Sequence, residues 1–120
     1  MSDVLIVDDQ SNIRRLLSIT LGREFQVLEA ENGASALCMV KMHHPRLVLL
    51  DVMMPGVMDG LDTLDAIKRD PTLAHIPVAI VSARGQAADL EDASRRGAAA
   101  YFVKPFSPLQ VVTWVREQLG

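Results

Sequence analysis

Three aspartates follow short apolar runs in this sequence. Asp8 and Asp9 come directly after residues 4–7, and Asp51 comes directly after residues 47–50. An aspartate carboxylate can accept a phosphoryl group, and its oxygens can bind a hard metal ion. Asp51 is the most informative of the three, because apolar residues stand on both sides of it and an unpaired buried charge is costly. We therefore take Asp51 as the candidate nucleophile.

Two other reactive groups follow apolar runs in the same way. Ser82 comes after residues 77–81, and Lys104 comes after residues 100–103. A hydroxyl and an ammonium group can both stabilise negative charge on a phosphoryl group. Whether Ser82 and Lys104 lie close to the aspartates depends on the strands and helices that position these residues.

The hydrophobic pattern predicts those elements. Short apolar runs are typical of parallel strands that are covered on both faces, and they occur at residues 4–7, 25–28, 47–50, 77–81 and 100–103. Helical spacing and capping residues predict five helices: from Ser11 to Gly22, from Asn32 to about His43, around residues 61–67, at 86–96, and from Ser107 to about Leu119. Alternating strands and helices predict an α/β fold with a parallel sheet and right-handed crossovers. We expect the flavodoxin-like (βα)5 sandwich, whose sheet order 2-1-3-4-5 makes the first and third strands neighbours.

The predicted fold brings the reactive groups together. Ligands of such sheets bind beyond the carboxyl ends of the strands, which is where all five groups stand. Three crowded carboxylates repel one another, and Lys104 supplies only one compensating charge. Mg²⁺ is the natural complement, with Mn²⁺ as an alternative, because hard cations prefer oxygen ligands. Taken singly, Asp8 or Asp9 is more often a helix cap, and Ser82 or Lys104 a surface residue; their coincidence favours a site.

Composition sets the outer limits. The 120 residues fit a single domain, and a net charge of −3 does not favour direct nucleic-acid binding. The start lacks a signal peptide pattern, and no apolar stretch is long enough to span a membrane, so we expect a cytoplasmic protein. The single cysteine, Cys38, excludes an internal disulfide, and we expect it to be a small core residue.

Four motifs in their order along the chain resemble the CheY-like receiver domains of two-component response regulators. They are Leu5-Ile6-Val7-Asp8-Asp9, Leu49-Leu50-Asp51-Val52-Met53-Met54-Pro55-Gly56 with Asp59-Gly60, Ile80-Val81-Ser82-Ala83, and Gly97-Ala98 through Tyr101-Phe102-Val103-Lys104-Pro105-Phe106. The resemblance spans the whole chain, residues 1–120, as one receiver domain.

The resemblance implies a role for each matching residue. Asp51 would be phosphorylated by a histidine kinase or phosphotransfer protein, and the chain would control an output domain or partner protein. Mg²⁺ would be held by Asp9, Asp51 and the Met53 carbonyl, with Asp8 acting through water. Lys104 and Ser82 would contact the phosphoryl oxygens, Ser82 and Tyr101 would form the switch, and the Lys104–Pro105 bond would be cis. Such a chain catalyses only its own phosphorylation and dephosphorylation.

Several features depart from the family or lie beyond the site. The loop at residues 56–58 is one residue longer than usual, which leaves its shape and the capping of the next helix open. Ala98-Ala99-Ala100 replaces the acidic residues of one dimer-forming subfamily, so we expect a monomer or weak dimer. Met53 and Arg84 would tune the lifetime of the phosphorylated state. The helix at 86–96 has Leu90 as its only large apolar residue, which suits a movable element or merely a solvated one.

The last helix is broadly apolar, and its packing has two readings. Either Val111 and Trp114 form an apolar patch for a partner, or Trp114 folds over the edge of the helix. Near the predicted pocket, Ile13, Arg14 and Leu17 are candidates for contact with a kinase helix, although core packing already explains Leu17.

Three other functions compete with a phosphorylated switch. A flavin-binding electron carrier needs a phosphate loop after the first strand, where Asp8-Asp9 would repel a phosphate. A small-molecule phosphatase or transferase usually has a second acid two residues after its nucleophile, where this chain has Met53. A degenerate receiver that only binds partners would not need the full set of acids.

Overall fold

A parallel sheet forms the centre of the molecule. The structure is a computed structural model, and it describes residues 2–54, 56 and 58–120. In this described part, five strands alternate with five helices: β1 Val4–Val7, α1 Ser11–Leu21, β2 Val27–Ala30, α2 Gly33–His43, β3 Leu47–Leu50, α3 Gly60–Arg69, β4 Val78–Ser82, α4 Ala87–Arg95, β5 Ala100–Val103 and α5 Pro108–Leu119. The strand order is β2-β1-β3-β4-β5, and all pairs are parallel, which confirms the predicted flavodoxin-like fold.

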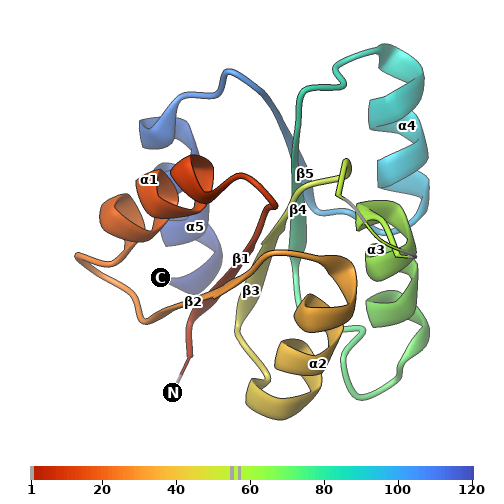
Figure 1. Cartoon of the computed structure of the whole chain (residues 1–120), viewed down its shortest axis with the longest axis horizontal. Coiled ribbons are helices and arrows are strands. Elements are labelled where there is room, and N and C mark those ends of the chain that lie inside the picture. Colours follow the sequence, from red (N-terminus) through yellow and green to blue (C-terminus); the bar gives the residue numbers. More distant parts are fainter. Residues whose placement is uncertain (1, 55, 57) are drawn as a thin grey trace.

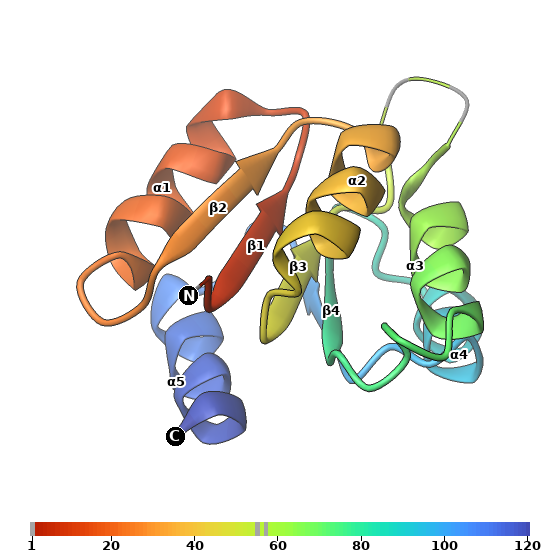
Figure 2. The same ribbon diagram turned by 90° about the horizontal axis from the view of Figure 1, so that it is seen from below.

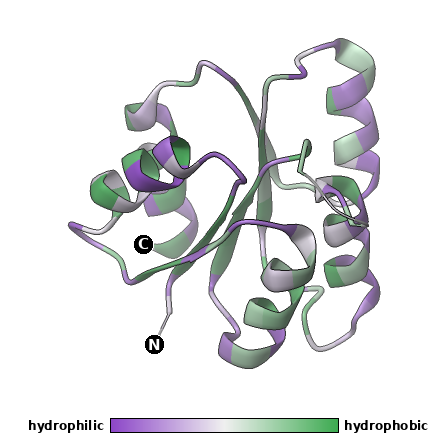
Figure 3. Cartoon of the chain, in the orientation of Figure 1, coloured by the Kyte–Doolittle hydropathy of each residue, from purple (hydrophilic) through white to green (hydrophobic). Residues whose placement is uncertain are grey.

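Helices cover both faces of the sheet. Helices α1 and α5 lie on one face, and α2, α3 and α4 lie on the other (Figures 1 and 2). Strands β1 and β3 are buried along their whole length, since each is covered from both sides. Their residues alternate between two core clusters: Leu5 faces α2 and α3, whereas Ile6 faces α1 and α5. The apolar strands run through the middle of the molecule in Figure 3.

The second strand begins later than the sequence predicts. The apolar run 25–28 favoured a strand there, but β2 covers Val27–Ala30 and pairs with β1 so that Val4 lies opposite Val27. Phe25 instead packs against the α1 and α5 cluster as a partly buried side chain. Because β2 is an edge strand and mostly half-buried, its own hydrophobic run does not mark its bounds.

Helix caps agree with the sequence in most places. Asn32 caps α2 as predicted, because its side chain accepts a hydrogen bond from the Ser35 N–H at 2.8 Å. Ser107 caps α5 in the same way through Gln110. The prediction for α1 is wrong by one residue: Gln10 is the N-cap and makes no side-chain cap bond, while Ser11 lies in the first turn.

The predicted burial of Cys38 is wrong, and one of the two readings of α5 is excluded. Cys38 is exposed on the outer side of α2 rather than buried in the core. Val111 is fully buried, so it takes no part in a surface patch. Trp114 packs edge to face against Phe102, with the ring centroids 6.0 Å apart, which matches the second reading of α5. Within the described residues, no helix is long and apolar enough to cross a membrane.

Candidate functional site

The carboxyl ends of β1 and β3 bring the three aspartates together. The Asp51 N–H donates to the Val7 carbonyl at 2.9 Å, which holds the end of β3 against the end of β1. One carboxylate oxygen from each of Asp8, Asp9 and Asp51 lies within 4.8 Å of the others. Asp8 and Asp51 are only 2% and 3% exposed, whereas Asp9 faces solvent. The predicted convergence of these carboxylates is therefore confirmed.

Lys104 reaches the same cluster from the end of β5. Its Nζ lies 2.8 Å from Asp8 Oδ2 and 3.6 Å from Asp51 Oδ2. The other oxygen of Asp51 accepts a hydrogen bond from the Met53 N–H at 3.2 Å. Lys104 thus forms its short ion pair with Asp8 and leaves Asp51 only weakly compensated. The following Lys104–Pro105 peptide bond is cis, as predicted.

The charge balance at Asp51 is unfavourable. Burial raises the pKa of Asp51 to about 6, and the neighbouring charges of Asp8 and Asp9 act in the same direction. The Lys104 ammonium and the Met53 N–H lower it, but they do not cancel the effect of burial. A divalent cation would relieve this repulsion, and three carboxylates form an oxygen donor set that suits Mg²⁺. The residues present therefore fit the predicted ion.

Ser82 and Tyr101 come from β4 and β5, the two strands that follow β3 in the sheet order. Ser82 is fully buried as the last residue of β4, and its Oγ accepts a hydrogen bond from the Arg84 N–H at 3.1 Å. The Tyr101 hydroxyl donates to the Arg84 carbonyl at 2.6 Å, and the half-buried ring packs against the core cluster that includes Leu5. Burial raises the pKa of Tyr101. The loop after β4 therefore contacts both predicted switch residues.

Two residues of the site escaped the sequence analysis. The Gln10 N–H donates to Asp8 Oδ1 at 2.9 Å, and its side-chain oxygen accepts from Lys104 Nζ at 3.2 Å. Arg14, considered above only for contact with a kinase, donates to the Asp8 carbonyl at 2.8 Å. The position of Gln10 directly after the aspartate pair was a usable signal. Nothing in the sequence showed that Arg14 turns back toward β1.

Helix α3 approaches the site closely. A Cβ added at Gly60 would lie 2.0 Å from the Asp51 carbonyl oxygen, so only glycine fits where α3 begins. Asp59 and Asp62 form a capping box at this helix start, so α3 is capped normally although the loop before it is one residue longer than usual. The inserted segment includes Val57, which lies outside the described residues.

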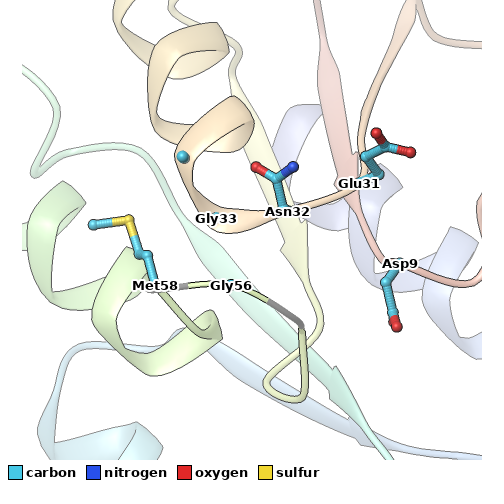
Figure 4. Close-up of a pocket in the computed structure, with 7 residues that line it drawn as sticks. Asp9, Glu31, Asn32, Gly33, Gly56 and Met58 are labelled. Carbon is cyan, nitrogen blue, oxygen red and sulfur yellow. The ribbon is translucent and has the colours of Figure 1, made fainter.

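A cavity of about 550 Å³ opens beside the aspartates. It lies between the start of α2 and the loop before α3, with Asp9 and Met58 on its wall (Figure 4). Glu31 also lines it but points away from Asp9, so it adds no ligand to the cluster (Figure 4).

Comparison with known proteins identifies the family. Residues 4–116 match the model of the response regulator receiver domain. The chain belongs to this family. Receiver domains are phosphoacceptor switches rather than classical enzymes, and they bind Mg²⁺ at an acidic cluster such as the one formed here by Asp8, Asp9 and Asp51.

Individual receivers resemble the chain over nearly its whole length. It is 40% identical to the probable transcriptional regulator ycf27 of Galdieria sulphuraria over 94% of this chain and 43% of that protein. It is 38% identical to the transcriptional regulatory protein ResD of Bacillus subtilis over 97% of this chain and 47% of that protein. The chain thus spans about half the length of these curated relatives.

Solved receiver structures have the same fold. The chemotaxis protein CheY4 of Vibrio cholerae superposes with a TM-score of 0.90 at 28% identity and covers 99% of each chain. The receiver domain of NtrX from Brucella abortus gives a TM-score of 0.89 at 34% identity, over 98% of each chain. Response regulators, the proteins that contain such domains, interact with histidine kinases and output domains in two-component signalling systems.

Proposed function

We propose that Asp51 of this receiver is the residue that accepts the phosphoryl group. The observation that supports this choice is its position: Asp51 is the buried carboxylate whose pKa is raised to about 6, and Lys104 is not already paired closely with it. Asp8 is held by Lys104 at 2.8 Å, and Asp9 is exposed at the rim. We therefore take Asp51 Oδ2, which has only the longer 3.6 Å contact with Lys104, as the attacking oxygen.

Transfer from a phosphohistidine is the reaction that this arrangement suits. A carboxylate oxygen of Asp51 forms the new P–O bond while the P–N bond of the donor breaks. The other ring nitrogen of the phosphohistidine carries a proton, so the leaving group is a neutral imidazole and the product is an aspartyl phosphate. Lys104 lies within reach to pair with the phosphoryl oxygens, and Ser82 is the proposed hydroxyl donor to them. Mg²⁺, when bound, would neutralise charge on the transferring group.

The proposed ligands of this ion are Asp9, Asp51 and the Met53 carbonyl, with Asp8 acting through water and Mn²⁺ as a substitute. The donor would be a histidine kinase or phosphotransfer protein in the cytoplasm. Slow hydrolysis catalysed by the domain itself would end the signal. We place the whole receiver within residues 1–120, with no direct nucleic-acid contact of its own.

Helix α4 is the element that we expect to move when Asp51 is phosphorylated. Helix α4 buries only Ala93 among its residues, and Leu90 is 37% exposed, so little apolar contact holds it on the sheet. The loop that connects Ser82 to α4 also accepts the hydrogen bond from Tyr101. A hydroxyl that moves toward a phosphoryl group at Asp51 would pull on this loop and shift the helix. If the hydrogen-exchange rates of α4 are the same with and without beryllofluoride, a mimic of the phosphoryl group, this switching role is refuted.

Two neighbours of the site are proposed to set the lifetime of the phosphorylated state. Met53 is 51% exposed and Arg84 is also exposed, so both side chains can meet water that approaches the phosphoryl group. Comparing the dephosphorylation rates of the wild type and Arg84→Ala tests this role. Equal rates would exclude Arg84.

The proposed oligomeric state is a monomer or weak dimer. Residues 98–100 are all alanine, so the acidic half of a salt-bridged dimer face is missing at this position. Solution scattering of the phosphorylated form tests this proposal, and a tight two-fold dimer through this face would contradict it.

Labelling by acetyl phosphate tests the central proposal. The wild type should gain one phosphoryl group per molecule in the presence of Mg²⁺ and none in the presence of EDTA. Asp51→Asn should remain unlabelled, whereas the exposed Asp62→Asn on α3 should be labelled like the wild type. Stoichiometric labelling of the Asp51→Asn protein would refute the assignment.

A further inference from the structure

Arg14 on α1 contacts the backbone at the end of β1 and a side chain of β2. Its Nη1 donates to the Asp8 carbonyl at 2.8 Å, and its Nε lies 3.2 Å from Glu29 Oε1. The side chain is 17% exposed, so most of it is covered although it comes from the surface helix α1. The guanidinium thus ties α1 to the end of β1 and to β2 at once.

We propose that Arg14 is a positioning residue for the metal site, an inference that rests on the proposed function of that site. The carbonyl that Arg14 holds belongs to the peptide unit between Asp8 and Asp9. This unit is planar, so fixing its oxygen also fixes the backbone from which both carboxylates extend. Partners that orient metal ligands from outside typically change metal affinity by about 10–100-fold when they are removed.

The other contacts of Asp8 hold its N–H and its carboxylate rather than its carbonyl. The N–H of Asp8 is held by the Ala30 carbonyl, and Asp8 accepts from the N–H of Gln10. Asp9 is exposed at the turn between β1 and α1. Arg14 therefore anchors the backbone of this turn, whereas Lys104 holds the Asp8 side chain.

Glu29 in turn fixes the guanidinium. It lies on β2 beside Ile6 of β1, which places its carboxylate on a strand that is hydrogen-bonded to the site strand. A planar guanidinium can donate to both acceptors from one fixed geometry, whereas a lysine ammonium on a flexible chain is not preorganised in this way. The choice of arginine at this position thus follows from the two acceptors it serves.

The sign of the effect separates positioning from simple charge. If Arg14 acted only through its positive charge, removing it would reduce the repulsion of Mg²⁺ and strengthen metal binding. If Arg14 positions Asp8 and Asp9, removing it weakens metal binding in spite of the lost repulsion. The two explanations therefore predict opposite changes.

Calorimetric titration with MgCl₂ on Arg14→Met tests the inference, with Arg15→Met as the matched control. Arg15 is exposed on the same helix, so the Arg15→Met substitution removes the same charge one residue away from Arg14. We expect Arg14→Met to weaken Mg²⁺ binding about 10-fold. Arg15→Met should stay within about twofold of the wild type, because an exposed charge at this distance is screened by salt. Circular dichroism in EDTA establishes that each variant is folded.

Equal or tighter Mg²⁺ binding by Arg14→Met would overturn the inference. If that variant does not fold, Arg14→Lys decides instead: we expect about threefold weaker binding from the loss of one of two contacts, and unchanged affinity would overturn the inference. Failure of the wild type itself to bind Mg²⁺ would refute the proposed function of the site, which is a different result.

Discussion

Replacing Asp51 by asparagine should stabilise the metal-free protein at neutral and higher pH. Burial and the charges of Asp8 and Asp9 raise the pKa of Asp51 from 3.8 to about 6. A pKa difference of one corresponds to about 1.4 kcal/mol, so this gap corresponds to about 3 kcal/mol above pH 6. Local relaxation and water lower the electrostatic cost, and we expect a gain of about 1–2 kcal/mol in the free energy of unfolding.

The pH dependence of this gain has a definite sign. The pKa of Asp51 is higher in the folded protein than in the unfolded chain, so the folded state binds the proton more tightly. Its contribution to stability is therefore present below about pH 4 and is lost as the pH rises through about 6. The difference between Asp51→Asn and the wild type should be small at pH 4 and should reach its full size by pH 7.

Urea unfolding followed by circular dichroism measures this difference. Both proteins are unfolded in EDTA at several pH values between 4 and 8, and Asp9→Asn serves as the comparison because Asp9 is exposed. We expect a smaller gain for Asp9→Asn. Adding Mg²⁺ should stabilise the wild type through binding to the folded state and should have much less effect on Asp51→Asn. An Asp51→Asn protein that is less stable than the wild type at pH 8 in EDTA would refute the reasoning.

Three further substitutions test how the fold supports the site. Gly60→Ala should cost about 3 kcal/mol and abolish labelling by acetyl phosphate, because the new Cβ would lie 2.0 Å from the Asp51 carbonyl; normal labelling would contradict this. Asp59→Ala should lower the free energy of unfolding by about 1 kcal/mol through loss of the α3 cap, with labelling retained. Lys68→Met should lower it by about 1–3 kcal/mol, because Lys68 donates at 2.7 and 3.0 Å to two carbonyls in the segment before β4. Urea denaturation measures the losses for Asp59→Ala and Lys68→Met. Unchanged stability of either variant would contradict the role assigned to the replaced residue.

Much of the fold follows from local sequence. The runs at 4–7 and 47–50 form strands because a short, continuous apolar stretch between polar segments suits a parallel strand that is covered on both faces. Asn32 starts α2 because its side chain satisfies a backbone N–H of the first turn. Parallel strands end at one edge, so the residues after them had to meet there. Once the flavodoxin-like strand order places β1 beside β3, the aspartate cluster follows from the residues that come after these two strands.

Other features depend on contacts between distant parts of the chain. β2 is displaced from its apolar run because pairing with β1 sets its register. Val111 is buried and Cys38 is exposed because packing on the sheet decides which face of each helix is covered. In a broadly apolar helix, the sequence does not show which face that is.

The site shows the same division. The sequence by itself determined which groups gather at the sheet edge: the acids, Ser82 and Lys104. Only the tertiary structure decided how their charges are shared, with Lys104 closest to Asp8, Gln10 beside it and Arg14 behind. The physical reason is that residue spacing fixes where a strand ends, whereas the partner that a long side chain selects depends on distances of a few ångströms between elements far apart in the chain.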